Sequence, residues 1–331
     1  MSQYSTGIIE DELDKCENIE DFKLLVIPKL VEQRERWRVK IAEIIRDSGM
    51  SVREFAHICR VSEPAVRKWL KGSLPQSRDA YIRIAFAAGY SLEETNHFLR
   101  RYGCCPELYP RSLEDSACIF VLKSKKLKHS YDSYTELLEL MHQEIEVNIP
   151  EKRVEYSTTE LLGHLDAADQ CEEMLCFVRE NAHIYLRPYA KLYNFILAFL
   201  EINLADAFGD LTTSFHAMAS ESGWSSSLRH CITEIRRGRW FPLRHKLISL
   251  GLHLNMDADD INRMLSLAKM DALYSQNPVE AAVKFAINEA KLSSEGDKIA
   301  ADGSNGLCLF VKDVLNQLEL SESEYLIDDL G

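Results

Sequence analysis

The sequence lacks the features that mark membrane and secreted proteins. None of its apolar runs reaches the roughly 18–20 residues that a helix needs to cross a bilayer. Residues 1–15 are acidic and do not show the basic-then-apolar order of a signal peptide. We therefore expect no membrane association and a cytoplasmic location.

Motifs for catalysis, cofactors and metals are also missing. There is no glycine-rich phosphate loop, no Gly-x-Ser-x-Gly and no His-Glu-x-x-His. The nine cysteines include no Cys-x-x-Cys pair, although structural zinc sites are built from close pairs of thiolates or imidazoles. We predict a protein that is not an enzyme and that holds neither a metal nor a cofactor. An active site assembled from residues far apart in the sequence is the alternative.

What the sequence does have is a contrast in charge. The whole chain carries a net charge of −13. Residues 32–83 nevertheless contain twelve lysines and arginines against seven aspartates and glutamates, a local excess of five positive charges. DNA responds to charges within a screening length of about 8–10 Å. A basic module on an acidic body is therefore compatible with DNA binding.

Residues 51–72 predict two short helices joined by a turn. Ser62 stands at an N-cap position, and Pro64 follows in the first turn, where its missing N–H costs nothing. Gly72 then ends the second helix. The apolar residues are spaced to form the inner faces of the two helices: Phe55, Ala56, Cys59, Val61, Val66 and Trp69.

This pattern resembles the helix-turn-helix of the bacterial Xre/Cro-repressor family. The resemblance is carried by Ala56, by Val-Ser at 61–62 and by the Trp-Leu-Lys-Gly ending at 69–72. Arg60 departs from the family, which usually has glycine at this turn position, and a left-handed residue other than glycine costs about 1 kcal/mol. From about residue 20 to 290 the chain also resembles bacterial proteins in which an Xre-type domain precedes a long helical region.

The resemblance implies that residues 62–71 form a recognition helix that enters the major groove of double-stranded DNA. Arg67 is the expected base contact, because its guanidinium fits guanine O6 and N7. Lys68 is an expected phosphate contact. The candidate DNA-binding residues are Arg53, Ser62, Glu63, Arg67, Lys68, Lys71 and Arg78.

A similar order of residues occurs twice in the chain. SLEETNHFLRR at 91–101 is echoed by DADDINRMLSL at 257–267. LYPRSLEDSACIF at 108–120 is echoed by LYSQNPVEAAVKF at 273–285. We interpret these echoes as an internal duplication. Chance similarity between amphipathic helices is the alternative.

If the chain is duplicated, a second, degenerate helix-turn-helix is expected just before residue 240. Ala219 and Gly223 have the spacing of its turn, and the helix that follows is about three residues longer than in the first copy. Residues 229–246 contain six basic side chains and one acidic one. We interpret this second basic patch as a supporting phosphate contact or a dimer surface, and its candidate residues are Arg229, Arg236, Arg237 and Arg239.

The rest of the chain is also predicted to be helical. Between 185 and 200, apolar side chains recur every three or four residues, which is typical of a helix face in the core; a ligand pocket at this stripe is the alternative. The prediction is an all-α fold with five regions: a helical lead-in at 1–30, the Xre-type domain with trailing helices at 31–122, a central helical region at 131–207, the degenerate repeat at 211–290, and a flexible loop, a C-terminal helix and an acidic tail at 291–331.

Together these features predict a sequence-specific DNA-binding protein, a transcriptional regulator that recognises its operator through residues 62–71. The helical body would form a homodimer, bind an effector or contact another protein. The alternative is a helical protein-interaction component, in defence or signalling, in which the helix-turn-helix serves as a docking module.

Overall fold

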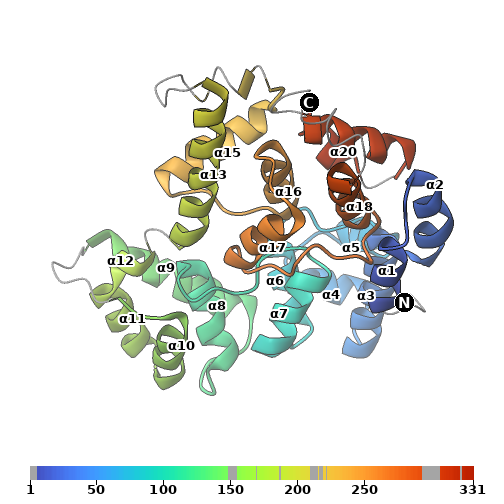
Figure 1. Cartoon of the computed structure of the whole chain (residues 1–331). Coiled ribbons are helices and arrows are strands. Elements are labelled where there is room, and N and C mark those ends of the chain that lie inside the picture. Colours follow the sequence, from blue (N-terminus) through green and yellow to red (C-terminus); the bar gives the residue numbers. More distant parts are fainter. Residues whose placement is uncertain are drawn as a thin grey trace. The chain divides into compact units, whose positions relative to one another are not determined.

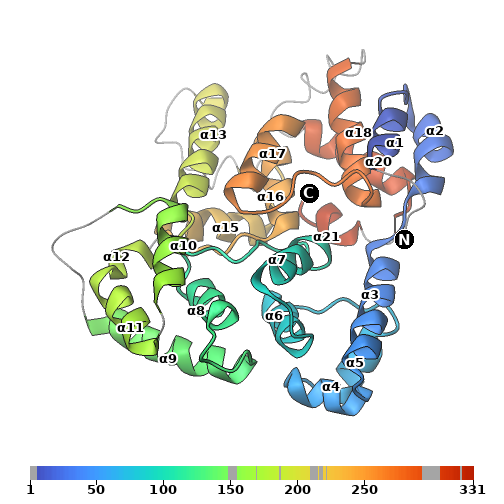
Figure 2. The same ribbon diagram turned by 90° about the horizontal axis from the view of Figure 1, so that it is seen from below.

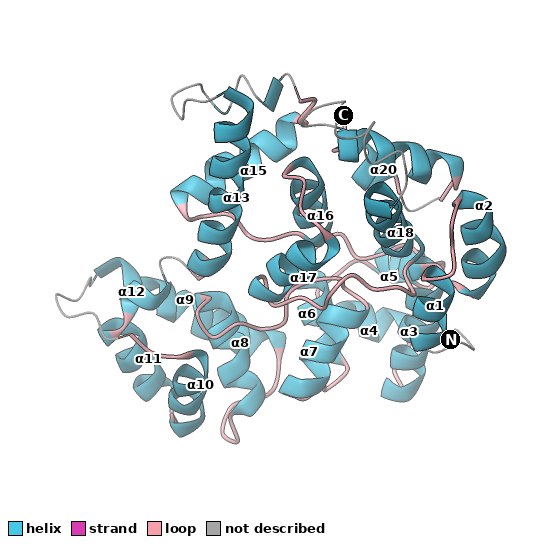
Figure 3. Cartoon of the chain, viewed as in Figure 1, coloured by secondary structure: helices cyan, strands magenta, loops and turns pink. Residues whose placement is uncertain are grey.

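A computed structural model of the chain describes residues 6–147, 155–168, 170–185, 188–208, 215, 219–220, 222–292, 306–320 and 323–331. Throughout these residues the regular structure is helical, without strands (Figure 3), so the predicted all-α fold is confirmed. No helix in the described ranges combines the length and the apolar character needed to cross a membrane. The chain divides into two compact units, unit 1 (Met1–Gln33 and Lys191–Gly331) and unit 2 (Arg34–Ala190).

Unit 2 contains the helices from α3 to α12 (Figure 1). Their bounds are α3 (Gln33–Ser48), α4 (Val52–Ile58), α5 (Glu63–Trp69), α6 (Arg78–Ala87), α7 (Leu92–Arg101), α8 (Leu113–Lys123), α9 (Tyr131–Val147), α10 (Thr158–Ala167), α11 (Cys171–Glu180) and α12 (Ala182–Tyr185).

The core of unit 2 contains a cluster of aromatic rings around Trp37 of α3, whose side chain is fully buried. Its ring lies edge-on to those of Trp69 and Tyr81, with centroids 6.4 and 5.3 Å away, and the ring of Phe98 lies at 6.1 Å. Aromatic pairs favour such edge-on and tilted arrangements. One aromatic cluster therefore joins α3, α5, α6 and α7.

Serine side chains begin several helices of unit 2. The hydroxyl of Ser91 accepts a hydrogen bond from the amide of Glu94, and the Glu94 carboxylate accepts one from the amide of Ser91. Ser157 and Glu160 form the same reciprocal pair at the start of α10, and Ser112 caps α8. These caps satisfy amide donors that the first turn of a helix leaves unpaired.

Unit 1 combines the first helices of the chain with the last ones. Its elements are α1 (Thr6–Leu13), α2 (Ile19–Asp21), the single π turn η1 (Phe22–Val26), the 3₁₀ turn η2 (Ile27–Lys29), α13 (Ala190–Phe208), α15 (Ser226–Arg237), α16 (Arg244–His253), α17 (Ala258–Leu267), α18 (Pro278–Leu292), α20 (Gly306–Gln317) and α21 (Glu324–Ile327).

The division into units differs from the five regions predicted from the sequence. The described part of the lead-in, residues 6–30, packs into unit 1, where the rings of Phe22 and Phe285 lie 5.2 Å apart. The region at 131–207 is split, because α9 to α12 pack in unit 2 whereas α13 belongs to unit 1. These associations join segments that are distant in the sequence, so the order of helices along the chain does not reveal them.

Three other predicted features have different outcomes. The apolar stripe between 185 and 200 is buried as expected of a core face: Tyr189, Leu192, Tyr193 and Ile196 are all inaccessible. The acidic tail contains the short helix α21 and packs against unit 1, so that Asp329 and Leu330 are buried. Except for its last residue, the loop predicted at 293–306 lies outside the described residues.

Unit 2 contains a buried arginine at the first position of α6. Arg78 donates two hydrogen bonds to the Asp115 carboxylate, at 2.6 and 3.1 Å, and further ones to the backbone carbonyls of Pro106 and Glu107. The side chains of Arg78 and Asp115 are 12% and 1% exposed. This ion pair ties the start of α6 to α8 and to the connection that precedes α8.

Unit 1 contains an arginine at the first position of α16 whose partners are of the same kind, one carboxylate and two backbone carbonyls. Arg244 donates two hydrogen bonds of 2.7 Å to the Glu280 carboxylate of α18, and it also donates to the carbonyls of Asp271 and Ala272. In each unit the carboxylate of the pair also accepts the backbone amide of a tyrosine, Tyr109 in unit 2 and Tyr274 in unit 1.

A second contact also occurs in both units. The side-chain oxygen of Asn96 in α7 accepts the amide of Leu108 at 2.9 Å, and that of Asn262 in α17 accepts the amide of Leu273 at 2.8 Å. These residues stand in the same order within the two sequence segments that echo each other. The echo in sequence is therefore accompanied by an echo in side-chain contacts.

We expect the substitution Arg78→Met to lower the free energy of unfolding by about 3–5 kcal/mol, because it leaves the buried Asp115 carboxylate without its counter-charge. The matched control is Arg46→Met, at an exposed residue of α3, for which we expect a change within about 0.5 kcal/mol. Denaturant unfolding of the two variants measures the difference. Equal losses in both variants would contradict the role of the ion pair.

Candidate nucleic-acid interface

Helices α4 and α5 lie within residues 51–72, where the sequence predicts two helices and a turn. Ser51 caps α4, its hydroxyl accepting the amide of Glu54 at 3.2 Å. Ser62 is the N-cap residue of α5, as predicted, although its side chain makes no capping hydrogen bond. Gly72 has a φ of 98°, the left-handed conformation expected after a helix end. The helix itself spans Glu63–Trp69 and is shorter than the predicted 62–71.

The inner sides of α4 and α5 are packed as the sequence predicts. Phe55, Cys59 and Val66 are fully buried, and Ala56 and Trp69 are nearly so. Trp69 lies edge-on to Trp37 of α3 in the aromatic cluster, and Figure 2 shows α3, α4 and α5 next to one another. This packing fixes which side of α5 faces away from the core.

The outer side of α5 carries the predicted DNA-binding residues. Ser62, Arg67, Lys68 and Lys71 are exposed, and so is Arg53 on α4. The Arg67 guanidinium, 63% exposed, donates from Nε and Nη2 to Oε1 of the half-exposed Glu63, at 3.0 and 2.6 Å. The lysine and arginine side chains of this face are thus exposed and do not pack into the core of unit 2.

The turn between α4 and α5 contains Arg60 in the left-handed conformation expected from the sequence, with a φ of 51°. Arg60 Nη2 lies 2.5 Å from Oδ1 of Asp132 in α9. Its backbone carbonyl accepts a hydrogen bond of 3.0 Å from Arg83 in α6. Two neighbouring helices therefore support a turn that glycine would form without strain.

Tyr131 of α9 adds to this support. Its ring lies 4.6 Å below the Arg83 guanidinium, and its hydroxyl donates a 2.6 Å hydrogen bond to Asp79. Asp79 also accepts from Arg83 at 2.7 Å. The sequence pattern did not predict this network, because Tyr131 belongs to a helix that follows the module by several elements.

The placement of Arg78 corrects an expectation from the sequence. Arg78 was predicted to contact a DNA phosphate, but its guanidinium donates hydrogen bonds to Asp115 and to two backbone carbonyls inside unit 2. A guanidinium already engaged with a buried carboxylate is not available to a phosphate. Arg78 is therefore excluded from the candidate interface.

The start of α15 in unit 1 has the backbone pattern of the α4–α5 turn. Gly223 has a φ of 67°. The amide of Trp224 donates to the carbonyl of Ala219 at 2.9 Å, as the amide of Val61 donates to that of Ala56 at 3.0 Å. Residues 216–218 and 221, which fall within the predicted second motif, lie outside the described residues.

The residues of the second basic patch differ in exposure. Arg236, Arg237 and Arg239 are exposed, and Arg229 is half-buried. Arg237 pairs with Glu234 at 2.9 Å, and the Arg236 guanidinium lies 5.4 Å from the ring of Phe215. The helix that carries the patch has 12 residues, against seven in α5.

The described residues also bear on metal and thiol chemistry. Among them, no group of three or more histidine, cysteine, aspartate or glutamate side chains is arranged to hold a metal ion. Burial raises the pKa of Cys59 to about 12, and burial likewise raises the pKa of Cys105 to about 12. Both side chains are therefore protonated thiols at neutral pH, whereas nucleophiles and metal ligands are thiolates.

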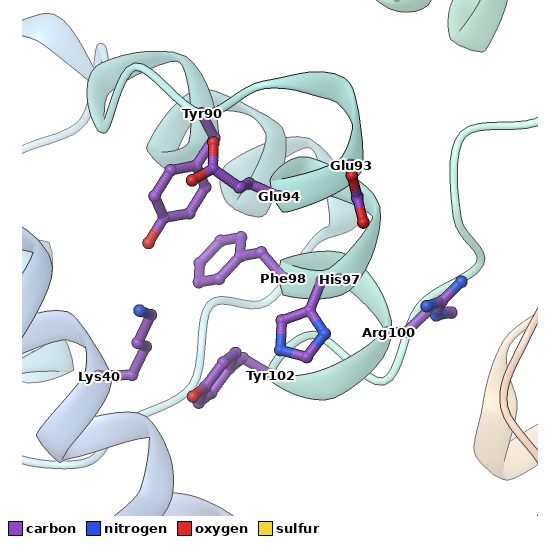
Figure 4. Close-up of a pocket in the computed structure, with 8 residues that line it drawn as sticks. All are labelled: Lys40, Tyr90, Glu93, Glu94, His97, Phe98, Arg100 and Tyr102. Carbon is purple, nitrogen blue, oxygen red and sulfur yellow. The ribbon is translucent and has the colours of Figure 1, made fainter.

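A cleft of about 350 Å³ lies between α3 and α7 in unit 2 (Figure 4). The ammonium of Lys40 lies 5.8 Å from the ring centroid of Tyr90 and 5.7 Å from that of Tyr102, within the range of cation–π attraction. No sequence motif indicates this cleft, because its walls come from helices far apart in the chain. Its lining residues are Lys40, Tyr90, Glu93, Glu94, His97, Phe98, Arg100 and Tyr102.

Comparison with known proteins returned no relative. No protein-family model, curated protein or solved structure matches the chain.

The cost of the left-handed turn can be measured with two variants of Arg60. Both Arg60→Gly and Arg60→Ala lose the exposed ion pair with Asp132, which contributes at most about 1 kcal/mol. Only alanine retains the steric cost of a positive φ, so we expect the glycine variant to be more stable by about 1 kcal/mol in denaturant unfolding. An alanine variant as stable as the glycine variant would show that the turn is not left-handed in solution.

Proposed function

We propose that this protein is a sequence-specific DNA-binding protein, a transcriptional regulator in which α5 is the recognition helix. The observation that carries the proposal is the two-sidedness of α5. Val66 and Trp69 are buried on one side, whereas Arg67 and Lys68 are exposed on the other. A helix with one side fixed to a core and a basic side exposed is suited to the major groove.

The exposed residues have different roles in this proposal. The Arg67 guanidinium has the planar fork that pairs with guanine O6 and N7, so it makes the base contact. The ammonium groups of Lys68 and Lys71 and the guanidinium of Arg53 contact phosphates, which position the module but carry no direct sequence information. Ser62, at the helix N-terminus, donates to a phosphate or a base edge.

The ion pair of Arg67 with Glu63 is consistent with this role. Both side chains are partly exposed, and pairs of this kind contribute at most about 1 kcal/mol. DNA can therefore displace Glu63 at a small energetic cost. While the pair is formed, it also restricts the Arg67 side chain, which reduces the entropy that binding has to remove.

The support of the turn favours the same conclusion. Arg60 and Arg83 connect the α4–α5 turn to α6 and α9 through Asp132 and Tyr131. A recognition helix has to keep its orientation when it meets the duplex, because contacts to base edges require well-defined geometry. The helical body thus supplies the rigidity that seven residues of helix do not have by themselves.

We further infer that the two units arose by duplication and that one module in each chain makes base contacts. The matched contacts of Arg78 and Arg244 support the duplication. When the two turns are aligned, Ser226 and His230 of α15 stand at the positions of Glu63 and Arg67, so α15 has no arginine fork for guanine. Specific recognition generally needs two half-sites, and a homodimer supplies the second one.

The proposal predicts different losses for two neighbouring residues. A duplex selected from random DNA provides the specific site, and a scrambled duplex provides the reference. Arg67→Ala should lower the preference for the selected site by about 10–100-fold, because a bidentate base contact contributes about 1–3 kcal/mol of discrimination. Lys68→Ala should weaken binding to both duplexes alike and reduce the slope of log affinity against log salt by about 1.

Fluorescence anisotropy titrations at several salt concentrations measure both effects. The control is Lys191→Ala, which removes an exposed positive charge of unit 1 and should change neither quantity. Absence of salt-dependent DNA binding, or identical behaviour of all three variants, would contradict the proposal and favour a protein-docking role for α4 and α5.

A further inference from the structure

The connection between α8 and α9, residues 124–130, carries positive charge that the proposed recognition helix does not use. Residues 116–131 contain four lysines and neither aspartate nor glutamate, in a chain whose net charge is −13. Lys123, at the end of α8, pairs with Asp166 of α10. The three lysines of the connection itself are exposed: Lys125, Lys126 and Lys128. Among the described residues, Lys125 and Lys128 have no ion-pair partner. We call this connection the lysine loop.

Hydrogen bonds to Ser124 hold the lysine loop in one shape. The Ser124 hydroxyl accepts the amides of Lys126 and Leu127, at 3.2 and 3.1 Å. The Nε2 atom of His129 lies 2.7 Å from the backbone carbonyl of Ser124. The partly buried Leu127 side chain packs against the core of unit 2. A loop fixed in this way presents its charges at defined positions, which leaves less entropy for binding to remove.

The lysine loop leads directly into the contacts that support the α4–α5 turn. The first two residues of α9, Tyr131 and Asp132, contact Arg83 and Arg60, and Figure 2 shows α4 and α9 along the same edge of unit 2. Even a fully extended chain from Lys128 to Asp132 spans at most about 14 Å. The major groove of DNA is about 12 Å wide. The loop therefore lies within about one groove width of the turn that precedes α5.

The corresponding segment of unit 1 is built differently. When the two echoed segments are aligned, Lys123 at the end of α8 corresponds to Asn288. Helix α18 does not end at this position but continues to Leu292. The lysine loop therefore belongs to the copy that carries Arg67, the proposed base contact, and the other copy has continuous helix in its place. The loop and the base-reading residue occur in the same unit.

The chemistry of the lysine loop indicates which part of DNA it suits. An ammonium group is a compact charge that binds phosphate well. In the proposed complex α5 fills the groove, so the phosphates along the border of the groove are accessible to the loop and the base edges inside it are not. Further along α9, the exposed carboxylates of Glu136 and Glu139 would repel phosphates. Contact is therefore confined to the loop and to one or two phosphates.

We propose that the lysine loop is a second DNA contact, in which Lys125 and Lys128 bind backbone phosphates beside the groove that α5 enters. The inference rests on the proposed DNA-binding function and adds to it a sequence-independent contact from outside the helix-turn-helix. Because Tyr131 and Asp132 connect the loop to the α4–α5 turn within unit 2, both elements meet the same duplex. Binding through α5 then raises the effective concentration of phosphate at the loop.

The test removes two charges from the loop of the full chain. The variant Lys125→Ala/Lys128→Ala is compared with Lys23→Ala/Lys191→Ala, which removes two exposed lysines of unit 1. In anisotropy titrations, we expect the loop variant to bind the selected and the scrambled duplex about 10-fold more weakly, with a slope of log affinity against log salt reduced by about 2. The ratio of the two affinities should stay the same, because phosphate contacts carry no direct sequence information. The control should change none of these quantities.

A charge-preserving variant separates loss of charge from damage to the loop. Lys125→Arg/Lys128→Arg should bind like the unmodified protein, because a guanidinium also binds phosphate. A loop variant with the affinity and slope of the control would overturn the inference. The proposed function would survive that result if Arg67→Ala still lost its sequence preference. Absence of DNA binding by the unmodified protein would remove both, so the two failures can be told apart.

Ethylation interference on the selected duplex shows whether the lysines touch particular phosphates. Ethylation removes the charge of one phosphate at a time, so it weakens binding where a phosphate is contacted. We expect one or two positions that interfere with the unmodified protein and with the control to stop interfering with Lys125→Ala/Lys128→Ala. The same interference pattern for all three proteins would show that the loop acts only through the general field of the protein, and the inference would fail.

Discussion

A helix of seven residues is too short to be stable in water on its own, because the cost of forming its first turn is recovered over only a few hydrogen bonds. Helix α5 persists because Val66 and Trp69 are buried on its inner side, where Trp69 meets the ring of Trp37. This contact determines both that the helix exists and which side of it is exposed. The proposed contacts with DNA depend on it, since none of the exposed residues holds the helix in place.

The buried ion pairs have a comparable role around the connections between helices. Arg78 joins the start of α6 to α8 in unit 2, and Arg244 joins the start of α16 to α18 in unit 1. Each guanidinium also donates hydrogen bonds to two backbone carbonyls, in the connection that precedes α8 for Arg78 and in the connection that precedes α18 for Arg244. Such a network fixes a long connection without regular structure, at the energetic cost of burying two charges.

Local features could be predicted from the sequence. The helix start at Ser62, the glycine after α5 and the left-handed Arg60 all follow from residues within a few positions of one another. Their physical causes, a cap or a steric limit on φ, act over one turn of the chain. The burial of the inner face of α5 followed in the same way from the spacing of apolar side chains.

Features that depend on distant partners could not be predicted. Arg78 has the position of an exposed helix-start residue, and only the fold brings it to Asp115. Asp329 looked like part of a solvated tail, and its contacts with Lys246 and Ser225 span most of unit 1 in sequence. The division of the chain into two units is of the same kind, because the first helices pack with the last ones.

The turn before α5 has one more consequence. A turn formed by glycine has no side-chain charge, so its stability would not depend on ionic strength. The ion pair between Arg60 and Asp132 is exposed, and dissolved ions therefore weaken it. In the proposed complex, salt acts on the protein as well as on the duplex, because it loosens the support of α5 while it screens the phosphates. The salt dependence of the proposed DNA binding would thus include a contribution from the protein's own conformation, and a count of phosphate contacts taken from that dependence alone would be too high.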